Sequence, residues 1–432
     1  MAAHKSFVSQ RAAKTFVRWK IFLMLLALIS MNYIDRASLS VAMPLIAREF
    51  KLDPAAQGVI LSSFFWTYAL LQIPGGILAD RFNPRIVIAG ATVFWGAFQV
   101  LACACTSGAA LLFTRLGLGA AEAPIYPAGG KLNSIWMTTN ERGRGATLLD
   151  GGAPLGAALG SLIVTSLIAV FGSWRPAFLI SGAGTMLAGM WAWSYMRNSP
   201  REHAGVNDAE ASYIEKGQEI EHLHEPANQT GRFLDFFKYR SVWAMFFGWM
   251  CFNSVFYGLL TWMPTYLNRT HGFDIGKMGG ASFLVFFSGF VGELTGGWIA
   301  DKWKSSGAPW NRVLRTLFAI AAIIATASIF SVSYARNPIF AVALLSSTLF
   351  FLRWCGLYWC IPSLLGTRDQ VGFLGGAMNL GGNIAGITIP VVVGLIVQHT
   401  GSYFLALMLF VVLGVGLLVC SIAIDYESKV PV

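Results

Sequence analysis

The stretch NYIDRASLS, residues 32–40, lies inside an apolar run that extends from about Ile21 to Leu45. A run of that length can cross a bilayer as a helix, because roughly 20 apolar residues are enough to do so. Asp35 and Arg36 fall well inside it, where a charged side chain costs at least about 2.5–3.5 kcal/mol on insertion scales. The pattern therefore predicts a membrane-spanning helix whose two charges have a function.

The composition of the whole chain extends this prediction. Of 432 residues, 55% are hydrophobic and 12% are charged, and the mean hydropathy is +0.59. Soluble domains carry about 25% charged residues, so the chain is expected to be a polytopic membrane protein. The apolar runs are continuous rather than alternating, which favours helices over a barrel. At about 30–36 residues for each span and its connection, the length accommodates roughly twelve helices.

The predicted order is six spans, a polar loop and six more spans. An N-terminal tail (1–20) precedes one bundle (21–197), a central loop (198–239) follows, and a second bundle (240–424) ends in a short tail (425–432). We expect spans at approximately 21–43, 57–79, 86–106, 109–131, 145–170, 175–197, 240–268, 278–300, 312–333, 338–366, 371–398 and 402–424.

Basic residues predict the orientation of these spans, because short cytoplasmic loops carry an excess of Lys and Arg. The chain contains 31 Lys and Arg against 21 Asp and Glu, a formal net charge of +10. The denser set lies in the tails and in loops such as 80–85, 142–144 and 302–315. This distribution places both termini and the central loop in the cytoplasm, and it explains the charge without nucleic acid as a partner.

The motifs that the sequence lacks exclude several other classes of protein. All six cysteines fall in apolar spans without disulfide or metal-ligand spacing. There is no Gly-x-x-x-x-Gly-Lys-Ser/Thr, no His-Glu-x-x-His and no Gly-x-Ser-x-Gly, so neither ATP drive nor an enzyme activity is expected. The first apolar segment is too long for the core of a cleaved signal peptide.

An internal repeat supports two related halves. Residues 74–81 (PGGILADR) end the second predicted span, and residues 295–302 (TGGWIADK) end the eighth. Two related halves with a binding site between them are typical of secondary transporters.

Several motifs together resemble a known family. Gly76-x-x-x-Asp80-Arg81-x-x-x-Arg85 resembles the signature loop of the major facilitator superfamily. Within it, the chain is similar to the anion:cation symporters, in particular the bacterial D-galactonate and related sugar-acid proton symporters. The motifs that carry this likeness are residues 32–40, Gln72–Gly76, Arg115-x6-Glu122-Ala123-Pro124, 208–214 and Gly386–Pro390.

The resemblance implies a fold and a function. The fold is all-α, with twelve transmembrane helices in two pseudo-symmetric six-helix bundles. The function is uptake of an organic carboxylate anion, such as a hexonate or hexarate, by proton-coupled symport and alternating access. The bacterial inner membrane, a functional monomer and no cofactor beyond the proton gradient follow from the same likeness.

The residues of the first span suggest how an anion is held. Tyr33, Arg36 and Ser40 share one helix face by their i, i+3, i+7 spacing. A guanidinium can hold a carboxylate with two hydrogen bonds, and a phenol can add a third. The alternative is an Asp35–Arg36 ion pair that only orients the span.

Arg115 and Glu122 are seven residues apart, so they lie on one face of the fourth span. We expect Arg115 to be the charge partner of Glu122, unless the glutamate forms a salt bridge to another span. All six histidines lie in tails or loops, so carboxylates must carry any coupled protons. The resemblance assigns this proton role to Asp35 and Glu122, and contact with the substrate carboxylate to Arg36.

The resemblance also places Tyr68, Asn379 and Trp359 in the substrate pocket. The loop that contains Gly76, Asp80, Arg81 and Arg85 is expected to act as a gate. In that hypothesis, Asp80 meets a helix N-terminus of the other bundle and the arginines hold nearby acids. The alternative is a basic turn that only sets the topology.

Three buried charges depart from the family pattern, namely Arg353, Asp150 and Glu293. Arg353 either pairs with Glu293 or faces the cavity as a second cationic contact, which would favour a dicarboxylate. The glutamine that serves sugar-hydroxyl recognition in the relatives is replaced near Ala153. An aromatic acid or dicarboxylate is therefore the alternative substrate, and a membrane sensor that binds a ligand without moving it is the alternative from another class.

Overall fold

The computed structural model describes residues 13–138, 141–222, 233–366 and 368–430. Residues 1–12 of the predicted N-terminal tail, 223–232 of the predicted central loop and 431–432 of the predicted C-terminal tail lie outside the described residues, as does the side chain of Asp80.

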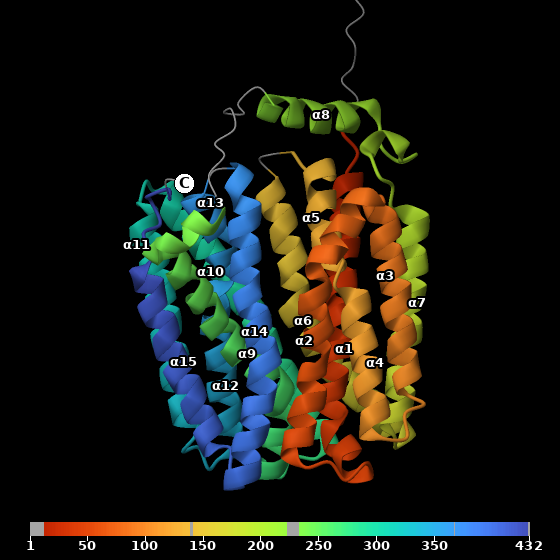
Figure 1. Cartoon of the computed structure of the whole chain (residues 1–432), viewed down its shortest axis with the longest axis vertical. Helices are drawn as coiled ribbons and strands as arrows, with labels where there is room; N and C mark the ends of the chain where they lie inside the picture. Colours follow the sequence, from red (N-terminus) through yellow and green to blue (C-terminus); the bar gives the residue numbers. More distant parts are fainter. Residues whose placement is uncertain (1–12, 139–140, 223–232, 367, 431–432) are drawn as a thin grey trace, which may run out of the picture.

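The N-terminal bundle consists of seven helices that form six spans (Figure 1). They are α1 (Val17–Glu49), α2 (Pro54–Arg81), α3 (Pro84–Ala102), α4 (Gly108–Glu122), α5 (Ile125–Trp136), α6 (Arg142–Phe171) and α7 (Trp174–Tyr195). The helices α4 and α5 follow one another across a two-residue break and together make the fourth span.

A long polar connection leads to the C-terminal bundle. The connection contains the 3-10 turns η1 (Pro200–Glu202) and η2 (Phe233–Lys238) and the helix α8 (Asp208–His222). The C-terminal bundle contains α9 (Arg240–His271), α10 (Ile275–Ser305), α11 (Trp310–Val332), α12 (Pro338–Leu352), η3 (Arg353–Cys360), α13 (Ile361–Leu365), α14 (Arg368–Thr400) and α15 (Phe404–Ala423).

Ten segments of the described chain are long and apolar enough to cross a membrane. The bent α4–α5 segment and α7 complete twelve spans, and no strand occurs among the described residues. The predicted all-α fold of twelve transmembrane helices is therefore confirmed. Figure 1 shows the two bundles side by side, with α8 lying across one end of the N-terminal bundle. We call this the α8 end and the opposite one the far end.

Two spans are broken near mid-depth, each next to a charged residue. The helix α4 ends at Glu122, directly before Ala123 and Pro124, and proline has no N–H to continue the helical hydrogen bonds. The helix α12 ends at Leu352, and η3 begins with Arg353. Broken helices at membrane depth are tolerated where the protein or a cavity surrounds the backbone, and they commonly mark transport sites.

The two bundles contact one another closely at the far end. A Cβ on Gly58 of α2 would overlap the carbonyl oxygen of Pro390 of α14, and one on Gly394 would lie 2.5 Å from the carbonyl oxygen of Pro54. The amide of Ala55 donates to Gln398 at 3.2 Å. Because only glycine allows this approach of backbone to backbone, the far end is closed.

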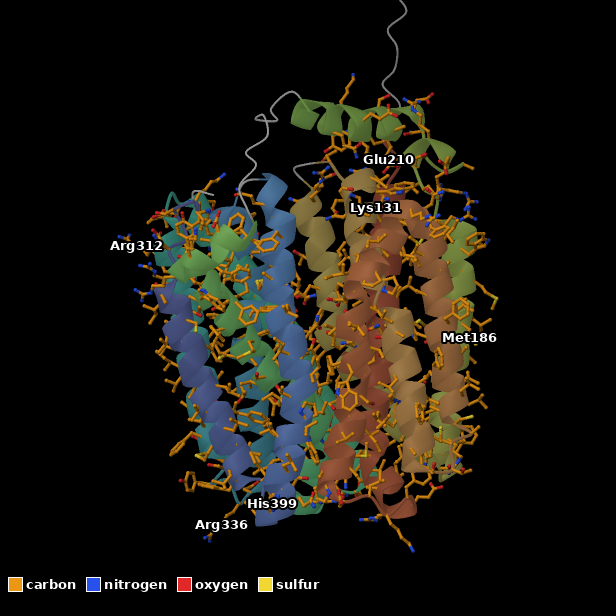
Figure 2. All side chains as sticks on the ribbon, viewed as in Figure 1. Lys131, Met186, Glu210, Arg312, Arg336 and His399 are labelled. Carbon is orange, nitrogen blue, oxygen red and sulfur yellow. The ribbon has the colours of Figure 1, made fainter. Side chains whose placement is uncertain are left out.

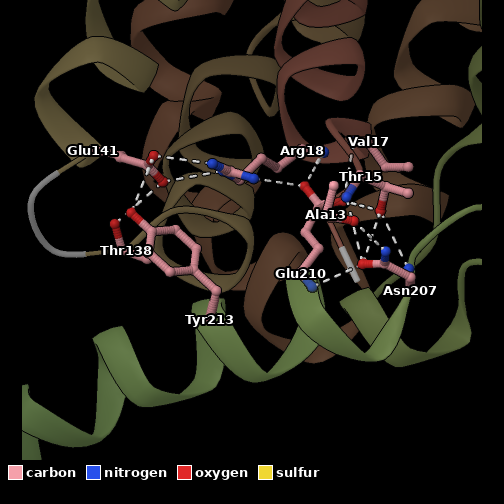
Figure 3. A network of polar contacts seen from close by, with 9 residues as sticks. All are labelled: Ala13, Thr15, Val17, Arg18, Thr138, Glu141, Asn207, Glu210 and Tyr213. Atoms are coloured by element: carbon pink, nitrogen blue, oxygen red, sulfur yellow. Dashed lines mark hydrogen bonds and ion pairs between the residues drawn. The ribbon is translucent and has the colours of Figure 1, made fainter. Parts of the chain in front are cut away.

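At the α8 end, a polar network fastens α8 to the N-terminal bundle (Figure 3). Glu210 is fully buried and accepts hydrogen bonds from the first amides of α1, Val17 at 3.2 Å and Arg18 at 3.3 Å. The guanidinium of Arg18 also pairs with Glu210 at 2.8 Å and with Glu141 at 3.1 Å. A carboxylate at a helix N-terminus satisfies free N–H groups and the helix dipole, so α8 moves with α1.

Candidate functional site

Arg36 and Glu122 form the centre of the candidate site. Arg36 Nη2 lies 3.1 Å from Glu122 Oε2, and the two side chains are 6% and 0% exposed. Arg36 comes from the middle of α1, and Glu122 is the last residue of α4. The break after Glu122 ends α4 at mid-depth, opposite α1, so the two charges meet inside one bundle.

Aromatic rings surround the guanidinium of Arg36. Its central carbon lies 4.2 Å from the ring centre of Phe64, 4.6 Å from Tyr33 and 5.0 Å from Tyr68. Such contacts stabilise a desolvated cation through the ring quadrupole. They hold the arginine in position without neutralising it, so its charge remains available to an anion.

Asp35 points to a different side of α1 from Arg36. Its Oδ2 accepts hydrogen bonds from Trp95 Nε1 of α3 at 3.0 Å and from Thr185 Oγ1 of α7 at 3.2 Å. Successive residues of a helix point about 100° apart, which explains the separation. Asp35 is fully buried, so the structure places it behind Arg36 and among three helices of the N-terminal bundle.

Glu122 forms its salt bridge with Arg36 of another span, which is the alternative stated above, and not with Arg115. Arg115 Nη1 instead donates to the backbone carbonyl of Asp35 at 3.3 Å, and its guanidinium lies 5.3 Å from the ring of Phe178. Spacing of seven residues puts Arg115 and Glu122 on one helix face, but it does not say which neighbour each side chain reaches.

A small cavity is lined by both arginines. Its walls are Arg36, Leu39, Ser40, Leu61, Phe64, Phe65, Arg115, Leu260 and Thr261, so it lies between α1, α2 and α4 on one side and α9 on the other. Among the described residues, Arg36 Nε and Arg115 Nε and Nη2 are buried without a hydrogen-bond acceptor. Unsatisfied buried donors cost free energy, so both arginines remain able to donate to an acceptor; the cavity, about 20 Å³ in volume, has room for about one oxygen-sized group.

The remaining predicted pocket residues divide between the two bundles. Tyr33 and Tyr68 are buried beside Arg36. Asn379 of α14 donates to Gln72 Oε1 of α2 at 3.1 Å, so it connects the two bundles. Trp359 of η3 is 38% exposed, and its ring lies 5.5 Å from that of Trp249.

Sequence reasoning missed several partners of these residues. Gln72 lies in the motif Gln72–Gly76, but the sequence suggested no binding role for it. Its Oε1 also accepts a hydrogen bond from Asn383 at 2.9 Å. Trp95 and Thr185, which hold Asp35, look like ordinary apolar-span residues. Periodicity alone could not distinguish them from core residues, because their partner lies on a distant helix.

Arg353 takes part in a second cluster rather than the first. Its Nη2 lies 2.5 Å from Glu293 Oε2 of α10 and 3.3 Å from Asp150 Oδ2 of α6. The pairing with Glu293 is the first of the two predicted possibilities. Asp150 adds a contact from the N-terminal bundle that the sequence did not reveal.

The predicted gating loop joins α2 to α3 at the α8 end. Arg85 does not hold an acid: its Nε donates to the carbonyl oxygen of Trp193 at 2.9 Å, and its guanidinium stacks 4.4 Å from that indole. Arg81 is exposed at the end of α2. A Cβ on Gly76 would lie in ordinary contact, 3.7 Å from Pro127. The predicted contact of Asp80 falls on a side chain outside the described part of the chain.

Comparison with known proteins agrees with this architecture. Residues 25–390 match the Major Facilitator Superfamily. The chain belongs to the major facilitator superfamily. It is therefore a multi-pass membrane transporter and not an enzyme, and its predicted likeness to sugar-acid carriers is confirmed.

Individual relatives match nearly the whole chain. A probable galactarate/D-glucarate transporter of Bacillus subtilis (strain 168) is 32% identical over 414 residues, which cover 92% of this chain and 90% of the relative. A probable sulfoacetate transporter of Cupriavidus necator is 31% identical, with 89% of each chain covered. A D-galactonate transporter of Escherichia coli O6:H1 is 27% identical, with 89% of this chain and 90% of the relative covered.

A solved structure shows the same fold. It is a bacterial homolog of the human lysosomal transporter Spinster in an inward-facing and occupied conformation. The TM-score is 0.70 at 17% sequence identity, and the alignment covers 95% of this chain and 97% of that one.

Proposed function

We propose that this transporter imports a sugar acid, a hexarate or a hexonate, together with protons. The names of the relatives support the substrate class, since they are galactarate/D-glucarate and galactonate transporters. The unsatisfied donors of Arg36 and Arg115 support an anionic substrate. The relative named for sulfoacetate favours a small dianion as the second candidate, which agrees with the dicarboxylate alternative.

The observation that carries the proposal is the buried ion pair of Arg36 with Glu122. In the proposed cycle, a substrate carboxylate and Glu122 compete for the same guanidinium. Protonation of Glu122 breaks its ion pair with Arg36, and the substrate carboxylate then binds to Arg36 instead. Substrate binding therefore requires a proton on Glu122, which is the condition for symport.

Asp35 is proposed as a second proton carrier in the same bundle. Trp95 and Thr185 hold its carboxylate, and Arg115 contacts its backbone. It does not touch Arg36, so its proton acts through the position of α1 and Arg115 rather than through direct competition with the substrate.

The proposed location is the inner membrane of a bacterium, with the α8 end in the cytoplasm and the protein active as a monomer. Figure 2 shows Arg312 and Lys131 at the α8 end, and Arg336 and His399 at the far end. Basic residues are denser in the short loops of the α8 end, which favours a cytoplasmic position. With the far end closed, this arrangement leaves the α8 end as the proposed side of access to the site.

Uptake into proteoliposomes tests the proposal. The purified protein is reconstituted, a proton gradient (acid outside) is imposed, and accumulation of labelled D-glucarate, galactarate, D-galactonate and sulfoacetate is measured. We expect one or more sugar acids to accumulate, the lumen to acidify with uptake, and a protonophore to abolish accumulation. Liposomes with Arg36→Ala protein are the control. Accumulation that ignores the gradient would contradict proton coupling, and no transport of any sugar acid would contradict the substrate class.

A further inference from the structure

A second group of buried charges lies outside the site described above. Asp150 on α6, Glu293 on α10 and Arg353 at the start of η3 meet near mid-depth. Asp150 belongs to the N-terminal bundle, whereas the other two belong to the C-terminal bundle. The proposed transport cycle assigns none of them a task.

The geometry of this group is unusual because both acids contact one nitrogen atom. Arg353 Nη2 lies 2.5 Å from Glu293 Oε2 and 3.3 Å from Asp150 Oδ2. The two carboxylates are therefore held close to one another. The Arg353 side chain is 3% exposed, against 11% for Glu293 and 21% for Asp150. The arginine is buried, while both acids keep some exposed surface.

Within the described part of the chain, Arg353 is the cation that forms ion pairs with these acids. The guanidinium of Arg353 lies 5.6 Å from the ring of Phe252 and 5.2 Å from that of Phe256, both on α9. The titratable groups that face the cluster are the phenols of Tyr33 on α1 and Tyr126 on α5 and the thiol of Cys355 on η3, and the guanidinium of Arg36 faces the same two phenols. Among the described residues, no other Lys or Arg forms an ion pair with Asp150 or Glu293.

The charges of the cluster do not balance when both acids are ionised. Two carboxylates and one guanidinium leave a net charge of −1 at membrane depth, where an unpaired charge is expensive. Two acids that share one site cannot both ionise freely, and one of them keeps a proton. One proton makes the cluster neutral and lets one acid donate a hydrogen bond to the other.

We propose that Asp150 and Glu293, which both contact Arg353, share one exchangeable proton between their carboxyl groups. The two acids form a third proton-binding site, between the bundles. This site goes beyond the proposed function, because it requires neither a particular substrate nor the protons of Asp35 and Glu122. The proton comes from water at the exposed edge of Asp150 and returns there, and no other group changes its charge.

The position of the site links this proton to the movement of the bundles. When the bundles separate at this depth, Arg353 and Glu293 remain together as a neutral pair in the C-terminal bundle. Asp150 then loses its cation, so the proton stays with it. When the bundles meet, Asp150 regains its contact with Arg353, and the proton is again shared with Glu293.

Infrared difference spectroscopy of the full-length protein in lipid nanodiscs tests this site without a substrate. Protonated carboxyl groups give a carbonyl stretch that disappears on ionisation at high pH. In an Asp35→Asn, Glu122→Gln background, we expect one such band to remain. We expect the band to vanish with either Asp150→Asn or Glu293→Gln. Each change leaves one carboxylate, whose charge Arg353 balances, so that this carboxylate no longer holds a proton. The matched control is Glu210→Gln, which removes a buried acid at the α8 end and should leave the band unchanged.

The same single changes in the otherwise unaltered protein provide a second measurement, should the background variant fold poorly. Each should then reduce the carboxyl band by one group. Absence of the band from the background variant, persistence in both single variants, or loss in only one of them would overturn the shared site. None of these results depends on transport, so failure of this inference is distinct from failure of the proposed function.

Discussion

The two buried charge clusters differ in the way they connect the bundles. Asp35, Arg36, Arg115 and Glu122 all come from α1 and α4, inside one bundle. Asp150, Glu293 and Arg353 join both bundles. When the bundles move as rigid bodies, contacts inside one bundle persist while contacts between them must break. The first cluster is thus suited to binding the substrate and to its competition with Glu122 for Arg36. The second cluster is suited to a contact that differs between the two orientations of the carrier.

The largest expected effect is that of Arg36→Ala, which removes the only cation paired with Glu122 among the described residues. The substrate carboxylate loses its cation as well; truncating one partner of a buried charge pair costs about 2–5 kcal/mol of binding, and each 1.4 kcal/mol is about tenfold in affinity. We expect both net uptake and exchange of sugar acid to fall by about 100-fold or more. Radiolabel uptake by protein with an unchanged gel-filtration profile measures this.

Arg36→Lys is the matched control for that change. It keeps the charge but loses the planar fork that binds a carboxylate with two hydrogen bonds. We expect activity between that of Arg36→Ala and the unaltered protein. Exchange by Arg36→Ala at nearly normal rates would show that the first cluster is not the anion site.

The next largest effect is that of Glu122→Gln, which keeps the shape of the side chain but cannot take up a coupled proton. Arg36 is then permanently free for substrate. We expect uphill accumulation to fall to the level of protein-free liposomes while substrate exchange across the membrane persists. Glu49→Gln, which alters an exposed pair with Arg175 at the far end, should leave both unchanged. Normal accumulation by Glu122→Gln would contradict the competition for Arg36.

A smaller effect is expected where the bundles close at the far end. Gly58→Ala places a methyl group against the carbonyl oxygen of Pro390, which belongs to backbone and cannot turn away. Overpacking costs about 1–3 kcal/mol, so we expect uptake to fall by about tenfold as far-end closure becomes less favourable. Gly90→Ala, where the new methyl meets nothing within 4 Å, is the control. Equal uptake by both variants would mean that this contact does not limit transport.

The smallest effect is expected from Asp150→Asn. It removes one partner of the contact between the bundles and leaves the Arg353–Glu293 pair intact. Because Glu293 still supplies Arg353 with a carboxylate, we expect the uptake rate to change by only about two- to fivefold, which corresponds to about 0.4–1 kcal/mol. Complete loss of uptake would place Asp150 in the binding site and remove the distinction between the two clusters.

Much of the first cluster could be predicted, because each member is a charge at an expensive depth. Asp35, Arg36, Arg115 and Glu122 stand out against apolar neighbours. Their pairing could not be predicted. The seven-residue spacing left open whether Glu122 pairs with Arg115 or with another span, and the break after Glu122 ends α4 where that side chain meets Arg36 of α1.

The second cluster was recognised only in part. Arg353 and Glu293 lie at similar depth in neighbouring spans, so their pairing was one of two stated possibilities, and Asp150 remained without a role. The missing information was the contact of α6 with α10 across the bundles. No periodicity records it, because α6 and α10 lie far apart in the sequence.

The amino-acid sequence by itself determined the membrane environment, the number of spans, the repeat and the positions of the buried charges. These properties depend on hydropathy, on the length of each apolar segment and on local motifs, all of which can be read segment by segment along the chain. Only the tertiary structure decided which charges meet: Arg36 with Glu122 inside one bundle, and Arg353 with acids from both. The physical reason is that the packing of helices distant in sequence determines which partner a buried charge meets. The free-energy cost of burying that charge, by contrast, depends on the depth of its own residue in the membrane.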